Sequence, residues 1–243
     1  MSNEGFLPEQ RRLVPAYFWK RPFDITGGMI CYLVRHGESA FNAAGRIQGQ
    51  MNVPLAELGT RQAQALAQHF ATLAAAGETF DAIYASPLDR ARLTAEPIAE
   101  RLGLPLRLDD RLKELNAGVF AGLVWSEIEA NHPAAAASWK TLDPDFRIPE
   151  GESRRDLMRR AESVLTSILA EPLERTIIVA HGGLLSAGLK ALLGVPAERN
   201  PFMLYNGSIS ILDQGVQLKL RTLNQIDHLQ LNGERLLSRL GDL

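Results

Sequence analysis

Short apolar runs alternate along the chain with segments whose apolar residues recur at helical spacing. The runs have the length and composition of strands and lie at about 30–34, 80–86, 105–109 and 175–181. Between the first two, Leu66, Phe70 and Leu73 belong to a helical stripe that stops at Gly77. Strands alternating with helices are typical of crossover connections. The pattern therefore predicts an α/β fold with a mostly parallel sheet.

Local signals place the other elements. The helix that opens at Pro87 is expected to kink or end near Pro97. Ser153 begins a capping box for a helix that runs to about Ala170, and another helix starts at Gly182. Two late strands, at about 208–213 and 216–223, predict a hairpin around residues 214–215. The segment 116–148 is irregular, and we expect one short helix in it, from Trp125 to Asn131.

The first 29 residues differ from the rest of the chain. They contain several Pro and Gly residues and an aromatic cluster, Tyr17-Phe18-Trp19, without a regular period. We expect an N-terminal arm over 1–29, lying on a single domain that spans 30–243. Met29 directly precedes the first strand, so we also hypothesise that translation can start there.

Composition excludes several classes of protein. The 243-residue chain is 46% hydrophobic and 22% charged, with a formal net charge of −2, which offers no basic field for nucleic acid. Cys31 is the single cysteine, so no intramolecular disulfide can form and a cytoplasmic location fits best. The N-terminus lacks the pattern of a signal peptide, and no apolar stretch is long enough for a membrane span. A homodimer remains open.

Two histidines follow predicted strands, where parallel sheets bind their ligands. His36 comes after the strand at 30–34, and His181 comes after the apolar part of the fourth run, at 176–180. Each is followed by glycine, Gly37 or Gly182-Gly183, which allows backbone N–H groups at a helix start to approach an anion. Either histidine alone would more often be a core or surface residue. Their matched contexts favour a shared site.

Charged side chains are predicted at the same edge of the sheet. Arg35 adjoins His36, and Arg90 lies near the start of the helix after the second strand. The planar guanidinium group of arginine binds two phosphate oxygens at once and keeps its charge at any working pH. Glu114 follows the third strand, and a carboxylate beside so much positive charge is useful for moving protons. The sequence therefore predicts a phosphoryl pocket. A metal site made with His36 and Glu114 is disfavoured because the arginines would repel a dication.

Five ordered motifs carry a resemblance to a known family. They are "LVRHGES", "GRIQGQMNVPL", "YASPLDRARLTAE", "LKELNAG" and "VAHGG", within about 30–220. Together with Asn42 they resemble the histidine phosphatase superfamily, in the branch of the cofactor-dependent phosphoglycerate mutases and their phosphatase relatives. The resemblance implies a three-layer α/β/α sandwich. It also implies an enzyme that needs no cofactor or metal and acts on a small phosphorylated substrate.

The resemblance also implies a role for each matched residue. His36 would attack phosphorus in line and form a phosphohistidine that water then hydrolyses. Glu114 would protonate the leaving alkoxide and then deprotonate the water. The phosphoryl oxygens would be held by a set of polar groups: Arg35, Arg90 and His181, with help from Asn42, Gln48 and the backbone at Gly182.

Motif details favour hydrolysis over mutase activity. Mutases carry an Arg-His-Tyr-Gly run after the catalytic glutamate and a long basic insertion, whereas this chain has Leu115-Asn116-Ala117-Gly118 and a modest segment. Gln48 also matches the phosphatases. Ala121 departs from their pattern, which often has Glu there. A phosphoglycerate mutase and a non-catalytic phospho-ligand binding scaffold remain the alternatives, although a scaffold would not need both His36 and Glu114.

Specificity is expected to reside in the irregular 116–148 segment, because loops above a rigid sheet edge shape the pocket. Four of its side chains are candidates to face the substrate: Phe120, Trp125, Phe146 and Arg147. For the aromatic ones, packing of a small cap onto the domain is an equally good interpretation. The sequence does not identify the alcohol that is released.

Overall fold

A six-stranded mixed sheet forms the centre of the computed structural model, which describes residues 28–231 and 234–237. The strand order is β3-β2-β4-β1-β5-β6. The strands are β1 (Met29–Arg35), β2 (Ala82–Ala85), β3 (Leu106–Leu108), β4 (Arg175–Ala180), β5 (Ile209–Gln214) and β6 (Leu218–Gln225). The first four are mutually parallel, whereas β5 is antiparallel to β1 and to β6. The predicted mostly parallel sheet and the late hairpin are confirmed.

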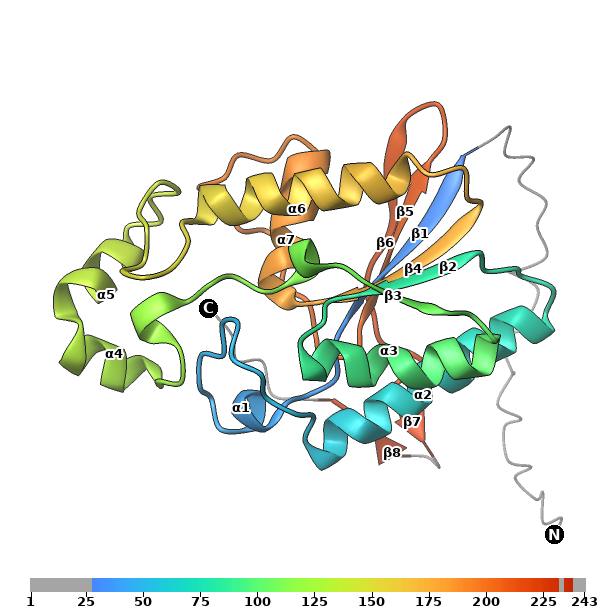
Figure 1. Cartoon of the computed structure of the whole chain (residues 1–243), viewed down its shortest axis with the longest axis horizontal. Coiled ribbons are helices and arrows are strands. Elements are labelled where there is room, and N and C mark those ends of the chain that lie inside the picture. Colours follow the sequence, from blue (N-terminus) through green and yellow to red (C-terminus); the bar gives the residue numbers. More distant parts are fainter. Residues whose placement is uncertain (1–27, 232–233, 238–243) are drawn as a thin grey trace, which may run out of the picture.

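Helices cover both faces of this sheet (Figure 1). The pair α2 (Glu57–Ala75) and α3 (Asp89–Leu102) lies on one face, and α6 (Arg154–Leu169) and α7 (Gly182–Leu192) lie on the other. Alternation along β1 explains the two cores: Cys31 and Leu33 face the α6 and α7 layer, whereas Tyr32 and Val34 face the α2 and α3 layer. The architecture is therefore the expected three-layer α/β/α sandwich.

Several predicted helix signals have the expected geometry. The Ser153 hydroxyl accepts a hydrogen bond from the Asp156 N–H, and the Asp156 carboxylate accepts one from the Ser153 N–H, which completes the capping box. Helix α3 ends at Gly103, whose φ of +67° is the left-handed conformation that glycine adopts without strain. Of the two outcomes expected at Pro97, a kink or an end of the helix, the structure excludes the end. The helix continues to Leu102, with Ile98 and Ala99 buried beyond the proline.

The segment 116–148 forms a small cap beside the sheet edge (Figure 1). A 3₁₀ turn at Gly118–Phe120 leads into α4 (Trp125–Asn131), which matches the expected helix, and into α5 (Pro133–Lys140), which was not predicted from the sequence. Pro133 occupies the first turn of α5, where its missing N–H costs nothing. Phe120 packs edge-on against Trp125 and Trp139, so these aromatic rings hold the cap together.

The remaining elements are short. Helix α1 (Ala40–Ala43) follows β1, a 3₁₀ turn spans Asp110–Leu112, and β7 (Gln230–Leu231) pairs with β8 (Glu234–Arg235). Among the described residues, no helix is both long and apolar enough to cross a membrane. The predicted arm over 1–29 lies outside the described residues except for its last two positions, so it stays a prediction, as does the alternative start at Met29.

Candidate active site

Strand register brings the two predicted histidines together. Strands β1 and β4 are parallel neighbours in which Arg35 pairs with Ala180, so the residues that follow them, His36 and His181, leave the sheet side by side. Their ring centroids are 5.1 Å apart with an interplanar angle of 62°. The His36 N–H also donates to the Ala180 carbonyl at 2.9 Å. The sheet itself therefore fixes this pair.

The hydrogen bonds of His36 define its tautomer. Its Nδ1 lies 2.6 Å from the Gly37 carbonyl oxygen, which can only accept, so Nδ1 carries the proton. The lone pair is consequently on Nε2. Burial lowers the pKa of His36 well below its usual value, and Arg90 and Arg35 lower it further, whereas the bond to Gly37 opposes the shift. His36 is therefore a neutral imidazole near pH 7.

His181 is fully buried beside this ring. Its Nε2 lies 2.8 Å from the Ser86 hydroxyl, and its Nδ1 has no hydrogen-bond partner among the residues that the structure describes. Burial is again the main cause of a pKa held well below the usual histidine value, followed by the charge of Arg90. His181 does not itself line the cavity around which the other groups gather. It stands immediately behind His36.

Two buried guanidinium groups supply the positive charge of the site. Arg35, the last residue of β1, donates through Nη1 to the Leu204 carbonyl. Arg90, in the first turn of α3, donates to the carbonyls of Met51 and Gly49 at 2.9 and 2.8 Å. Burial lowers the pKa of each to about 10, while Glu114 opposes the shift. Both groups therefore remain cations at neutral pH.

Glu114 is held between two helices although it lies in no helix or strand. Its Oε1 accepts from the N–H of Leu115 at 2.8 Å, and its Oε2 accepts from the N–H of Gly183, in the first turn of α7, at 2.9 Å. Its carbonyl oxygen accepts from Arg160 of α6 at 3.0 Å and from Gln50 at 2.9 Å. The carboxylate thus has a fixed position at the sheet edge.

Glycine at position 183 is required for that position. A Cβ added to Gly183 would lie 2.5 Å from Glu114 Oε1, closer than Cβ atoms approach other atoms in proteins, so any larger residue would displace the carboxylate. The preceding residue, Gly182, begins α7 and lines the same cavity. Free N–H groups and the helix dipole make such a helix start favourable for an anion.

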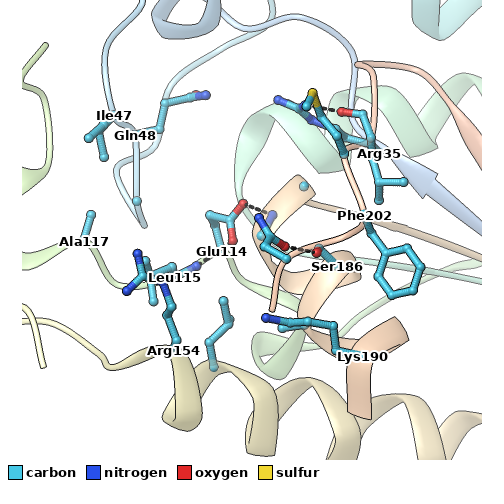
Figure 2. Close-up of a pocket in the computed structure, with 18 of the residues that line it drawn as sticks. Arg35, Ile47, Gln48, Glu114, Leu115, Ala117, Arg154, Ser186, Lys190 and Phe202 are labelled. Carbon is cyan, nitrogen blue, oxygen red and sulfur yellow. Dashed lines mark hydrogen bonds between the residues drawn. The ribbon is translucent and has the colours of Figure 1, made fainter. Parts of the chain in front are cut away.

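A cavity of about 580 Å³ joins these groups (Figure 2). The predicted site residues that line it are Arg35, His36, Gln48, Arg90, Glu114 and Gly182. Asn42 does not line it. Its Oδ1 instead accepts hydrogen bonds from the N–H of Ser39, which caps α1, and from Asn206. The structure therefore gathers six predicted residues around one space and places Asn42 and His181 behind it.

The four candidate specificity residues of the cap lie elsewhere. Phe120 is completely buried, and none of Phe120, Trp125, Phe146 and Arg147 lines the cavity, so the expectation that they face the substrate is wrong. Arg147 instead forms an ion pair with Asp156 and donates to the Gly151 carbonyl. The competing interpretation, packing of a small cap, is correct for the three aromatic residues.

Other residues form the outer wall of the cavity. From the cap come Trp139 and Leu142, and from helices and a later loop come Arg154, Lys190, Phe202 and Met203. None of these was predicted from the sequence. Arg154 directly follows the helix cap at Ser153, which gives no indication of a cavity. Lys190 interrupts an otherwise apolar helix, and this charge in an apolar pattern is a signal that the sequence contains.

Among the described residues, no group of three or more His, Cys, Asp or Glu side chains is placed to hold a metal ion. The positive charge around His36 comes from arginine. The arrangement combines a neutral imidazole with a free Nε2 lone pair, two cations and a carboxylate. These are the groups that phosphoryl transfer requires.

Comparison with known proteins gives this arrangement a family. The model of the histidine phosphatase superfamily (branch 1) matches residues 31–224, which include every residue of the site. The chain belongs to this superfamily. The matched span also contains the whole six-stranded sheet except the first two residues of β1 and the last of β6, so the family assignment covers the fold as well as the motifs.

Relatives within the superfamily carry different names. A protein named "Probable phosphoglycerate mutase GpmB" from Yersinia pestis (strain Pestoides F) is 39% identical over 184 residues, which are 75% of this chain and 83% of the relative. The solved mycobacterial glucosyl-3-phosphoglycerate phosphatase is 31% identical with a TM-score of 0.69, over 81% of this chain and 99% of that one. The alpha-ribazole phosphatase from Shigella flexneri is 28% identical with a TM-score of 0.73, over 81% and 96%.

Proposed function

We propose that the protein is a metal-independent phosphomonoesterase that acts on a small phosphorylated metabolite through a phosphohistidine intermediate. The observation that carries this proposal is the neutral His36, whose Nε2 lone pair is free beside Arg35, Arg90 and Glu114. A protonated or differently hydrogen-bonded imidazole could not act as a nucleophile from Nε2.

The first step transfers the phosphoryl group to the enzyme. His36 Nε2 forms a bond to phosphorus while the bond between phosphorus and the ester oxygen breaks. Arg35 and Arg90 stabilise the equatorial oxygens, whose charge is spread over three atoms in the transition state. Protonated Glu114 gives its proton to the departing alkoxide, so that the product leaves as an alcohol.

The second step regenerates the enzyme. A water oxygen attacks phosphorus, Glu114, now a carboxylate, takes a proton from the water, and the bond between phosphorus and Nε2 breaks. Inorganic phosphate leaves and His36 is again neutral. The hydrogen bonds from the N–H groups of Leu115 and Gly183 hold the carboxyl group of Glu114 in one position, which suits a group that acts in both steps.

The relatives support hydrolysis of small metabolites. Two solved relatives are phosphatases by name, for glucosyl-3-phosphoglycerate and for alpha-ribazole phosphate. The 39% identical protein is named a probable mutase, which keeps that activity as the second candidate. Against it, two residues that follow Glu114 and line the cavity, Leu115 and Ala117, are apolar, whereas mutases carry an Arg-His-Tyr-Gly run there.

The decisive experiment is a panel of phosphomonoesters assayed with wild type and His36→Ala, with and without EDTA. We expect hydrolysis that EDTA does not change and that His36→Ala abolishes. Rapid quenching at alkaline pH with radiolabelled substrate should trap one phosphoryl group on the wild type and none on the variant. Activity that survives His36→Ala, or that EDTA removes, contradicts the proposal.

Glu114→Gln separates the acid role from simple damage to the site. We expect a loss of about 100-fold or more with alkyl phosphates, whose alkoxides need a proton, and a much smaller loss with nitrophenyl phosphate. Equal losses would argue against the acid role.

For the mutase alternative, 3-phosphoglycerate is supplied with a bisphosphoglycerate primer. Formation of 2-phosphoglycerate faster than release of phosphate would replace the hydrolase proposal.

A further inference from the structure

Two further cations line the active-site cavity and have no part in the two catalytic steps. Arg154 is the first residue of α6, and Lys190 lies in the last turns of α7. In Figure 2, Glu114 is drawn between Arg35 on one side and Arg154 and Lys190 on the other. The charges that act on His36 are those of Arg90 and Arg35, whereas Lys190 is influenced by Arg154. The cavity therefore has two cationic regions.

Arg154 is held along one edge of its guanidinium group. Its Cζ lies 3.3 Å from the centroid of the Trp139 ring, and its Nη2 donates to the Trp139 carbonyl at 3.1 Å. Its Nη1 is buried and has no hydrogen-bond partner in the described part of the chain. Because the stacking fixes the plane of the guanidinium, Nη1 is a pre-oriented donor without an acceptor.

Lys190 is a buried lysine of α7, and lysine is rarely found at buried positions. It is only 6% exposed, and its Nζ donates to the Ala197 carbonyl at 3.2 Å. An ammonium has three donors, so this bond leaves two others. Burial lowers the pKa of Lys190, the charge of Arg154 lowers it further, and Glu198 opposes the shift. An anion placed near both cations would relieve this unfavourable environment.

The charge of this region indicates what kind of anion fits. Glu198 lines the same cavity, so the formal charges of Arg154, Lys190 and Glu198 leave one net positive charge. A carboxylate neutralises that charge, whereas a phosphate dianion would leave an excess of negative charge. Apolar residues also line the cavity, among them Leu115, Ala117 and Leu157. A short carbon chain suits such a lining.

We propose that Arg154 and Lys190 form a second anion subsite, which binds a carboxylate of the substrate while its phosphate lies at Arg35 and Arg90. The preferred substrates are then phosphomonoesters of hydroxy acids. This inference rests on the proposed function for the position of the phosphate. It adds a specificity determinant that comes from α6 and α7 rather than from the cap.

The test uses two matched ladders of substrates. One ladder consists of ω-carboxyalkyl phosphates, and the other of ω-hydroxyalkyl phosphates with the same number of carbons. At the best length, we expect kcat/KM to be about 10- to 100-fold higher for the carboxylate than for the hydroxyl compound, the usual value of charge-assisted hydrogen bonds. A third ladder, of alkanediol bisphosphates, should show no such advantage. A preference for bisphosphates would overturn the assignment to a carboxylate.

Variants connect the preference to the two side chains. Lys190→Met and Arg154→Met each should reduce the carboxylate-to-hydroxyl ratio of kcat/KM by about 10-fold or more, mainly through KM. Arg154→Lys should recover part of the ratio. Arg159→Met is the matched control, because Arg159 is an exposed residue of the same helix that does not line the cavity. It should leave the ratio unchanged. Variants that keep the wild-type ratio would overturn the proposal.

A binding measurement makes this test independent of turnover. Calorimetry with His36→Ala and the two ladders should show tighter binding of the carboxylate compounds, and Lys190→Met in the same background should remove the difference. If hydroxyalkyl phosphates are hydrolysed without any preference for carboxylates, the subsite fails and the phosphatase stands. If nothing is hydrolysed but carboxylates bind more tightly through Lys190, the phosphatase fails and the subsite stands.

Discussion

The rings of His36 and His181 meet edge to face at a centroid distance of 5.1 Å, and both are buried close to Arg35 and Arg90. Two imidazoles at this distance cannot both be charged without an anion between them. For each ring, burial and the charge of Arg90 already hold the pKa low. His36 is therefore neutral without help from an acidic partner, as its proposed role as nucleophile requires.

We predict that both rings stay neutral in the free enzyme at pH values below the ordinary histidine pKa of about 6.5, because burial and the charge of Arg90 lower both pKa values. Nitrogen NMR spectra of the imidazoles should show the proton of His36 on Nδ1 and a bare Nε2 throughout a titration from pH 8. Spectra of His36→Gln and His181→Gln assign the two signals. A His36 signal that becomes doubly protonated above pH 6 would contradict this prediction.

Gly183→Ala should damage catalysis and leave the fold intact. The new Cβ would meet Glu114 Oε1 at 2.5 Å, whereas alanine within a helix is about 1 kcal/mol more favourable than glycine. We expect a loss of about 10- to 100-fold in kcat with alkyl phosphates and no decrease in melting temperature. A double-mutant cycle with Glu114→Gln is the control. In the Glu114→Gln background, Gly183→Ala should cause little further loss of kcat. Fully additive losses of kcat would show that Gly183→Ala acts elsewhere than on Glu114.

Arg160 is predicted to be a positioning residue for Glu114. Its guanidinium donates to the carbonyls of Lys113 and Glu114 and pairs with Glu152 at 2.7 Å. Arg160→Met should lower kcat for alkyl phosphates more than for nitrophenyl phosphate, and Arg160→Lys should recover part of the loss. Arg155→Met is the matched control, because Arg155 lies on the same helix as Arg160 and its side chain forms an exposed ion pair with Asp145 of the preceding loop. Equal losses for both leaving groups would indicate a structural role alone.

Stability should depend on pH through a second histidine pair. The rings of His69 and His228 lie 5.0 Å apart, and burial lowers both pKa values, that of His228 to about 4. An unfolded histidine binds its proton near pH 6.5, so the unfolded state takes up more protons as the pH falls. The contribution of His228 is therefore complete above about pH 6.5 and is lost progressively towards about pH 4.

Urea unfolding measured between pH 7.5 and pH 4.5 checks this expectation. The free energy of unfolding should decrease by at most about 1.4 kcal/mol per pH unit for each such histidine. In His228→Gln, the amide can still donate to the Gly207 carbonyl. The decrease in the free energy of unfolding should be smaller in this variant by the contribution of one histidine proton. An unchanged slope in this variant would mean that His228 titrates normally in the folded protein.

Much of the fold could be predicted because its signals are local. The apolar run at β1 and the capping box at Ser153 each determine their own element, and the structure has both. Helix α5 was not predicted because Pro133 and the alanines after it show no amphipathic pattern, although proline is well suited to a first helical turn. At Pro97, the buried residues on both sides outweigh the lost hydrogen bond.

The inner site was predictable for a topological reason. Residues after parallel neighbouring strands must meet at one edge, so Arg35, His36 and His181 were placed by strand order alone. The outer wall depends on how α6 and α7 pack against the cap, which is a matter of side-chain contacts between distant segments. For that reason, sequence spacing does not place Arg154 and Lys190 at the cavity, although a lysine within the apolar helix α7 is itself a visible signal.

The single cysteine has a practical consequence. Cys31 is completely buried in β1 between two paired strands, and burial raises the pKa of its thiol. A thiol reagent can reach it only when the central sheet separates, so the rate of labelling measures how often the whole domain opens. The opening rates of all proposed variants that keep Cys31 can therefore be compared by thiol labelling. The comparison needs no added probe and no activity assay.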